Sequence, residues 1–335
     1  LMLGLTTSFL SMVLDNVTTV VLIAPMTVLI AEFLGVSPVP LLISQAIFSN
    51  TGGMATLVGD PPNILIGAAA GLSFNDFVSH LGPIVLVLWG VTFFVLRYLF
   101  RDQLRVVDPE AQHQRAIHSL NAREALTDSK GAQRVLLVLG GVVVLFMLER
   151  TLHITPAFAA LTGAMIALSW TQMGVHEVLK EVEWDVLLFF MGLFVMVGGL
   201  EAAGVLEQVA KSLLTLQDSS PVLLGLIIMW AMVVLSALID NVPVTIAIIP
   251  IVLNLGMEGV DIRPIWWAIA LGAGLGGNAT PIGSTANVFV ISVSERTDRP
   301  ITGREWLSIG VPAVLVASLV ASALYVLMFD FLSAG

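Results

Sequence analysis

Three aspartates lie inside apolar stretches of this 335-residue chain, where a charged side chain is unfavourable unless it has a function. Asp15 opens the string DNVTT, Asp240 opens DNVPVT, and Asp60 lies within VGDPPN. A carboxylate at the centre of a bilayer costs about 2.5–3.5 kcal/mol even on the lenient insertion scale, so each acid should line a wet or ion-filled cavity. Acids in such a cavity can carry protons or bind a cation, and the sequence does not distinguish these two roles.

The sequence repeats around these acids. Residues 15–25 and 240–250 share five identities, and residues 52–66 and 276–290 share six. Unrelated apolar segments would share roughly one identity per window, which favours an internal repeat. Paired interruptions of hydrophobic segments in two halves of a chain are typical of a secondary transporter, with a binding site near the middle of the membrane.

Amides, hydroxyls and glycines accompany the acids. Glycine lets the backbone approach a ligand, and broken helices offer free amides to anions and free carbonyls to cations. Asp60 corresponds to Ser284 in the repeat, so one half carries an extra acid that could couple an ion. The predicted substrate- and ion-binding residues are Asp15, Asn16, Thr18, Thr19, Asn50, Thr51, Gly53, Thr56, Asp60, Asn63, Asp240, Asn241, Thr245, Asn278, Thr280, Ser284, Thr285 and Asn287.

A structural alternative exists for two of the acids. Aspartate often precedes a helix as its N-cap, so Asp15 and Asp240 could cap helices at water-exposed loops. We expect no catalytic residue, resident metal or cofactor, beyond a transported or coupling proton or sodium ion at Asp15, Asp60 and Asp240. Trp184, Trp266, Trp267 and Trp306 lie near predicted span ends and are interpreted as membrane-belt residues.

Composition indicates a protein that lies in lipid. Hydrophobic residues make up 57% of the chain and charged residues 11%, and the mean hydropathy is +0.97. The absence of cysteine excludes thiolate ligation of a metal or of arsenic. Only 14 basic residues are present, without a basic patch interleaved with aromatics, so nucleic-acid binding has no support. We expect a multi-pass protein of the cell (inner) membrane.

The apolar pattern predicts an all-α polytopic membrane protein with inverted repeats, two re-entrant helical hairpins and two discontinuous transmembrane helices. Residues 1–14 and 18–33 form the first predicted hairpin, and residues 221–257 form the second. The predicted broken helices cover residues 38–71 and 263–294. Full spans are expected at 80–100, 134–149, 155–172, 184–200 and 307–330, with an interfacial helix at 201–216.

One long hydrophilic stretch divides the chain. Residues 1–100 would be the C-terminal part of the first repeat, 101–133 a cytoplasmic linker, and 134–335 the second repeat. The arginines of the linker place it in the cytoplasm by the positive-inside rule, and counting crossings from it makes the two hairpins open to opposite sides. If the halves are equivalent, roughly 90 residues with several spans are missing before residue 1.

The strings DNVTT, NTGGMATLVGDPPN, IDNVP and GGNATPIGSTANV resemble the paired motifs of the ion transporter superfamily. The closest groups are the arsenical-pump membrane proteins and the melanosomal P protein group, with a citrate-transporter-like domain. This resemblance implies a homodimer in which each protomer moves its hairpins and broken helices against a scaffold. Related divalent-anion/sodium symporters carry Ser-Asn-Thr at the hairpin tips, where this chain has Asp-Asn-Val. Sodium/proton antiporters of the superfamily carry acids in this region.

We therefore expect a secondary transporter that moves a small inorganic ion, arsenite or another oxyanion, coupled to protons or sodium. Sodium/proton antiport ranks second and sodium-coupled symport of an organic anion such as a dicarboxylate or citrate third. A channel or a non-transporting scaffold is the rival from another class. No ATP-binding motif is present in the sequence. A separate ATPase subunit is kept as an alternative partner. An enzyme is not expected, because no nucleophile–base pair is evident.

Overall fold

The computed structural model describes residues 2–101, 103, 129–172, 174–182, 184–205, 208 and 220–334, and no strand occurs among them. Five of the described helices are long and apolar enough to cross a membrane. They are α2 (Asn16–Leu34), α5 (Phe74–Leu99), α7 (Ser129–Met147), α13 (Pro221–Leu238) and α17 (Gly303–Leu327).

The first half of the chain forms a helix pair, a broken helix and a long helix. α1 (Met2–Ser11) packs beside α2, and both pack against α3 (Val39–Gly53). The chain then breaks at residues 54–60 before α4 (Pro61–Ala70) begins. Two prolines occupy the first positions of α4, where an amide donor would have no helical partner in any case. α5 follows after a short turn.

The same order of elements returns in the second half. α13 and α14 (Asn241–Met257) form a helix pair, and α13 packs closely on α15 (Arg263–Gly276). A break at residues 277–284 separates α15 from α16 (Thr285–Ser294). The long helix α17 and the short α18 (Phe329–Ser333) complete the chain.

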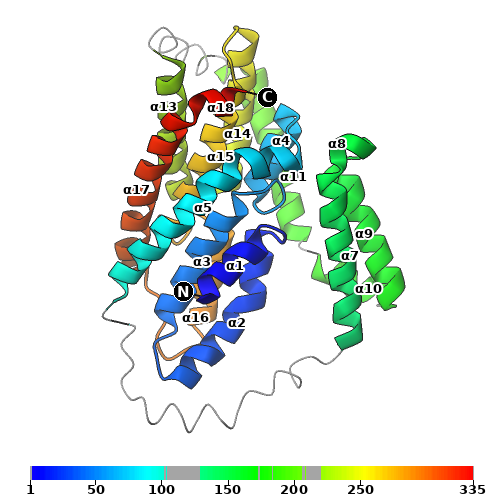
Figure 1. Ribbon diagram of the computed structural model, residues 1–335, viewed down its shortest axis with the longest axis vertical. Coiled ribbons are helices and arrows are strands. Elements are labelled where there is room, and N and C mark those ends of the chain that lie inside the picture. Colours follow the sequence, from blue (N-terminus) through cyan, green and yellow to red (C-terminus); the bar gives the residue numbers. More distant parts are fainter. Residues whose placement is uncertain are drawn as a thin grey trace.

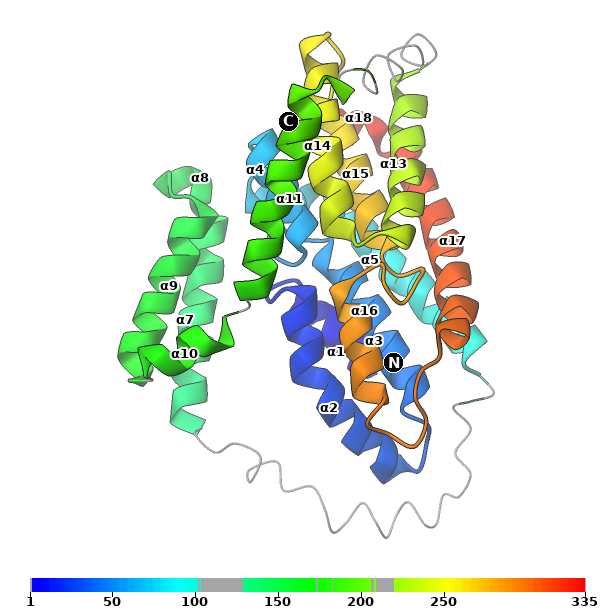
Figure 2. The ribbon, with the colours of Figure 1, turned by 180° about the vertical axis from the view of Figure 1, so that it is seen from behind.

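The two halves interlock. α16 packs against α2 and α3, while α4 packs against α14 and α15, so each half places its second broken-helix segment on the other half. Figures 1 and 2 show α2 and α16 towards one end of the molecule and α13, α14 and α4 towards the other. The two breaks consequently lie near each other in the middle.

A separate group of helices lies beside this core. α7 packs on α9 (Pro156–Thr171), with the single-turn α8 (Glu149–Leu152) between them (Figure 1). α10 (Val175–Glu181) leads to α11 (Trp184–Ala202), which packs against α14. The apolar side chains on α7 and α9 are largely exposed, as expected for surfaces that face lipid.

Both breaks lie where the sequence predicts them. α2 and α5 differ from expectation. The second helix of the first predicted hairpin, expected at 18–33, is α2, which starts at Asn16 and is long enough to cross a membrane. Its length therefore does not require the first helix pair to be re-entrant. α5 starts at Phe74 rather than at residue 80, because Ser73 and Asp76 form a capping box that begins the helix earlier. The expected linker and the interfacial helix lie largely outside the described residues.

Candidate ion-binding site

Asp60 lies at the centre of the structure, in the first break. Asp60 is 1% exposed. It directly precedes α4, but its side chain makes no capping hydrogen bond to that helix. Asn16 Nδ2 donates to Asp60 Oδ1 at 3.1 Å, and Asn241 Nδ2 approaches Oδ1 and Oδ2 at 3.3 and 3.5 Å. Since Asn16 begins α2 and Asn241 begins α14, the starts of both helices meet at one acid.

Asn50 on α3 extends this contact to the second break. Its Oδ1 accepts hydrogen bonds from Asn16 Nδ2 at 2.9 Å and from Ser284 Oγ at 3.1 Å. Its Nδ2 donates to Asn278 Oδ1 at 2.9 Å and to Asn287 Oδ1 at 3.1 Å. A single amide therefore links the two broken helices, and Ser284 occupies the place in the second half that Asp60 holds in the first.

Two asparagines hold the breaks in shape. The buried Asn63 amide donates to three backbone carbonyls at 3.3, 3.2 and 2.8 Å, those of Gly53, Met54 and Thr56. The equivalent Asn287 donates at 2.7 and 2.9 Å to the carbonyls of Gly277 and Thr280. Backbone carbonyls freed by a helix break need such donors when they are buried away from water.

Two threonines tie the breaks to the helix pairs. Thr56 Oγ1 donates to the Met12 carbonyl at 2.6 Å, and Thr280 Oγ1 donates to the Ala237 carbonyl at 2.6 Å. Met12 lies just after the first helix of one pair, and Ala237 lies in the last turn of the first helix of the other. The repeat seen in the sequence is thus also a repeat of individual hydrogen bonds.

Glycines allow close backbone approach inside each break. A Cβ atom on Gly277 would lie 2.8 Å from the Gly283 carbonyl oxygen, and one on Gly59 would lie 2.6 Å from the Gly53 carbonyl oxygen. Real Cβ contacts are not this short, and the obstacles are backbone atoms that cannot swing away. Gly53, a predicted site residue, therefore allows the backbone of the break to pack closely.

Asp15 and Asp240 act as N-caps. Asp15 Oδ1 accepts from the amides of Val17 and Thr18, both at 2.9 Å, and Oδ2 accepts from the Thr18 hydroxyl. Asp240 Oδ1 accepts from the Val242 amide at 3.0 Å, and its Oδ2 accepts from Thr285 Oγ1 at 3.2 Å. The capping alternative is thus what their hydrogen bonds show. Neither acid is hydrogen-bonded to Asp60, although each precedes an asparagine that is.

The remaining predicted residues divide into two kinds. Thr51 and Thr245 are buried, but their hydroxyls donate to carbonyls of their own helices, at 2.6 and 2.8 Å. Thr19 Oγ1 and Asn16 Oδ1 are buried and have no hydrogen-bond partner among the described residues. These two oxygens lie one turn apart on α2 and are available to a ligand.

Two contributors were missed by the sequence analysis. Ser49 Oγ donates to the Asn16 carbonyl at 2.9 Å and so fixes the start of α2. Trp306 is fully buried, and its Nε1 donates to the Asn278 carbonyl at 3.1 Å, so its interpretation as a membrane-belt residue is wrong. Trp266 and Trp267 are 3% and 2% exposed, so the same interpretation is wrong for them. Ser49 directly precedes the asparagine of the NTGG string, which was the available signal, whereas nothing local distinguishes Trp306 from a belt residue.

Known proteins resemble the chain over nearly its whole length. Residues 1–272 match the family described as Citrate transporter. The chain belongs to this family. An uncharacterized transporter of Mycobacterium tuberculosis is 41% identical over 333 residues, which cover 97% of this chain and 76% of that protein. The 46 kDa membrane protein of Mycobacterium leprae is 40% identical over 335 residues, with coverage of 97% and 76%.

The P protein of Sus scrofa is 28% identical over 397 residues, which cover 96% of this chain and 47% of that protein. The resemblance to the melanosomal P protein group is therefore confirmed. The family and its relatives are transporters rather than enzymes. The described residues include five helices long and apolar enough to cross a membrane, so this transporter is a multi-pass integral membrane protein. Its bacterial relatives indicate the cell membrane.

The site of this transporter consists of amides, hydroxyls and one buried carboxylate. Within the described ranges, no group of three or more His, Cys, Asp and Glu residues could hold a metal ion. Neutral oxygens with a single carboxylate suit a hard, weakly bound cation or a proton better than a transition metal.

Proposed function

We propose that this protein is a secondary active transporter in which Asp60 binds the coupling cation, a proton or a sodium ion. The observation that carries the proposal is the environment of this carboxylate. It is buried, receives two amide donors, and forms no ion pair among the described residues. A buried charge without a counter-charge is unfavourable by several kcal/mol, and binding a proton or cation relieves that cost.

Two unpartnered oxygens in the first turn of α2, the helix whose first residue bonds to Asp60, support a cation at this place. Asn16 bonds to Asp60 through Nδ2, while its Oδ1 and the hydroxyl of Thr19 remain unsatisfied. A buried polar atom without a partner costs about 1–3 kcal/mol, and a bound ion would satisfy it. Sodium prefers such neutral oxygens combined with a carboxylate.

We further infer that residues 1–100 and 134–335 belong to inverted repeats that work by alternating access. The equivalent hydrogen bonds of Asn63 and Asn287, and of Thr56 and Thr280, support the repeat. The opposite directions of α2 and α14 from the centre in Figure 2 support its inversion. Re-entrant helix pairs, the cytoplasmic position of the linker and a homodimer are parts of the same proposal.

The substrate that we propose is a small anion. Arsenite or a similar inorganic oxyanion follows from the likeness to arsenical-pump proteins. It would bind by replacing the hydrogen bonds that Asn50 Nδ2 and Ser284 Oγ now donate to other side chains of the site. The family description, Citrate transporter, favours an organic carboxylate as the second candidate. Cation exchange without an anion, as in sodium/proton antiport, is the third. A channel would show flux without any coupling gradient.

Proteoliposomes containing the full chain test these assignments. Uptake of citrate, a dicarboxylate and arsenite would be measured under an imposed sodium or proton gradient, for the unaltered protein and for Asp60→Asn, Asp15→Asn and Asp240→Asn. We expect one anion to accumulate against its gradient and Asp60→Asn to abolish that accumulation. Because asparagine caps helices as well as aspartate does, Asp15→Asn and Asp240→Asn should retain it. Gradient-driven uptake that survives Asp60→Asn would contradict the proposed coupling site.

A further inference from the structure

A second polar site lies away from Asp60, at the end of the molecule where several helices begin or end. A cavity of about 410 Å³ is lined by Asp76, His80, Arg150, Arg263, Trp266 and Trp267. The end of α4, the starts of α5 and α15, the α8 corner and the C-terminal residues surround it. Figure 1 shows α8, α4, α18 and the C-terminus at this same end. The ends of apolar helices mark the level of the membrane–water interface.

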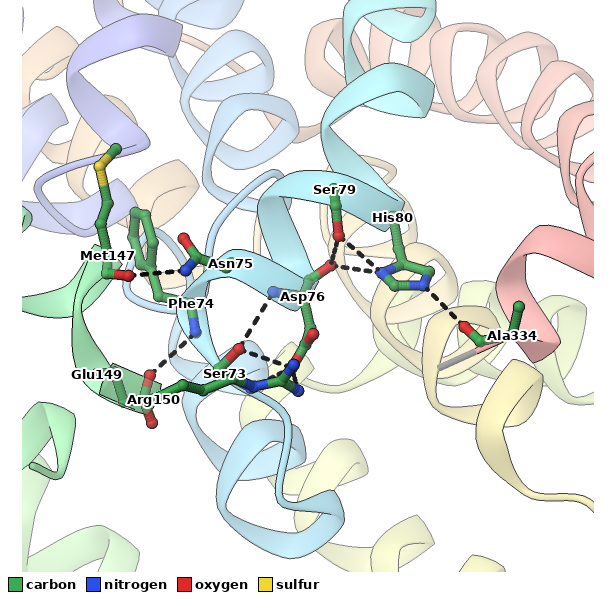
Figure 3. Close-up of polar contacts among 10 residues, drawn as sticks. All are labelled: Ser73, Phe74, Asn75, Asp76, Ser79, His80, Met147, Glu149, Arg150 and Ala334. Carbon is green, nitrogen blue, oxygen red and sulfur yellow. Dashed lines mark hydrogen bonds and ion pairs between the residues drawn. The ribbon is translucent and has the colours of Figure 1, made fainter. Parts of the chain in front are cut away.

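Arg150 is held at the cavity by the start of α5 (Figure 3). Its Nη2 atom contacts Asp76 Oδ2 at 2.6 Å, and the same oxygen accepts from Ser73 N and Ser73 Oγ, both at 2.7 Å. The neighbouring Glu149 Oε2 accepts from the Phe74 amide at 3.1 Å, which anchors the α8 corner. The Arg150 side chain is 66% exposed, so its other N–H groups remain available. Asp76 thus orients Arg150 without using all of its donors.

Arg263 supplies a second guanidinium from a distant part of the sequence. It lies in the first turn of α15, where its backbone amide donates to Asp261 Oδ1 at 3.1 Å. Its guanidinium group has no hydrogen-bond or ion-pair partner among the residues that the structure describes. With Asp76 at −1 and the two arginines at +2, the charged lining of the cavity carries one excess positive charge.

Aromatic side chains form a rigid wall behind these charges. The His80 ring stacks on Trp267 at 4.7 Å and on Phe331 at 4.8 Å between ring centroids. Trp267 Nε1 donates to the Leu332 carbonyl at 3.2 Å, and His80 Nε2 lies 3.4 Å from the Ala334 carbonyl oxygen. The wall is therefore built from α5, α15 and the C-terminal residues, and it offers an apolar surface next to the two guanidinium groups.

We propose that this cavity binds the head group of an anionic phospholipid, with Arg150 and Arg263 contacting the phosphate. A phosphodiester carries a single negative charge, which matches the single excess positive charge of the lining. Each guanidinium group can bind two phosphate oxygens at once through its fork of N–H donors. The apolar lining, including Leu253 and Ile262, would contact the glycerol and upper acyl carbons. Free phosphate shares the charged chemistry but would not use these apolar contacts.

The test uses the full chain in detergent and native mass spectrometry with short-chain phosphatidylglycerol, phosphatidylcholine or inorganic phosphate as probes. We expect phosphatidylglycerol to bind in preference to phosphatidylcholine, and Arg263→Gln or Arg150→Gln to weaken that binding about tenfold each. Arg304→Gln, an exposed arginine in the first turn of α17 that does not line the cavity, is the matched control and should leave binding unchanged.

Arg263→Gln is the decisive variant, because it removes no hydrogen bond or ion pair of the described structure and should fold normally. Phosphatidylglycerol binding that is unchanged in both cavity variants would overturn the proposal. Equal binding of the two lipids, or binding of inorganic phosphate that the variants weaken while lipid binding persists, would overturn it as well. The last result would assign the arginines to a soluble anion instead.

Discussion

Replacing Asp60 with asparagine separates the charge of this side chain from its shape. Asn16 and Asn241 donate amide hydrogens to the carboxylate at 3.1 and 3.3 Å. A hydrogen bond to a charged acceptor contributes about 1.5–3 kcal/mol and one to a neutral acceptor about 1 kcal/mol, so two weakened bonds cost about 1–4 kcal/mol. Removing a buried charge recovers several kcal/mol. The terms oppose each other, and Asp60→Asn should fold with a stability close to that of the unaltered protein.

Cation binding is the property that should disappear. A cation present at 100 times its dissociation constant stabilises the folded state by about 2.7 kcal/mol. With an unfolding entropy of about 2.1 cal/mol/K per residue, that energy corresponds to a rise of about 4 °C in the melting temperature of a chain of this length. If sodium is the coupling ion, the unaltered protein should show this rise on addition of sodium, and Asp60→Asn should show none. Gradient-driven accumulation in proteoliposomes should be abolished in the variant, because without a bound coupling cation the imposed gradient no longer drives transport.

Two controls make the result decisive. Asp15→Asn leaves the helix cap and Asp60 in place, so it should retain both the sodium-dependent rise and the accumulation. Potassium or choline at the same ionic strength should not replace sodium. If protons are the coupling ion, sodium will have no effect on melting, and only the proton-driven flux will separate Asp60→Asn from the unaltered protein. An Asp60→Asn variant that accumulates substrate as the unaltered protein does would refute the reasoning.

Three further predictions concern the architecture of the site and can be checked by thermal unfolding in detergent. Asn63→Ala removes a donor from three buried carbonyls and should destabilise the protein by about 2–3 kcal/mol, and an unchanged melting temperature would show that these carbonyls find other partners. Gly277→Ala should destabilise the protein by more than about 1 kcal/mol, because the new Cβ would lie 2.8 Å from the Gly283 carbonyl oxygen. Gly140→Ala is the control and should be neutral or stabilising, because no atom lies within 4 Å of the new Cβ. Equal changes in melting temperature for the two variants would contradict this account. Asp240→Ala should cost about 1 kcal/mol through loss of its cap to Val242, while Asp240→Asn should cost less, and the reverse order would argue against the capping role.

Much of the fold follows from local chemistry. Glycine and proline interrupt α3 before α4, and the same types of residue interrupt α15 before α16, so both breaks could be located from the sequence alone. The start of α5 was misplaced, although Ser73 and Asp76 form a capping box that the sequence contains. The interlocking of α16 with α2, and of α4 with α14, could not be predicted, because it depends on contacts between segments far apart in the chain.

The roles of the site residues show the same division. The sequence identified the polar residues that cannot face lipid, since their cost in hydrocarbon depends only on residue type and on apolar neighbours. It offered helix capping by Asp15 and Asp240 as an alternative without choosing it, although these caps are local bonds to the next amides. It could not bring Asn16 and Asn241 to Asp60, because that contact depends on which helix starts meet. Composition and the repeat determined a membrane transporter with a polar centre. Only the packing of helices from both halves decided that this centre contains one uncapped, buried carboxylate, because only tertiary contacts determine which donors reach which acceptor.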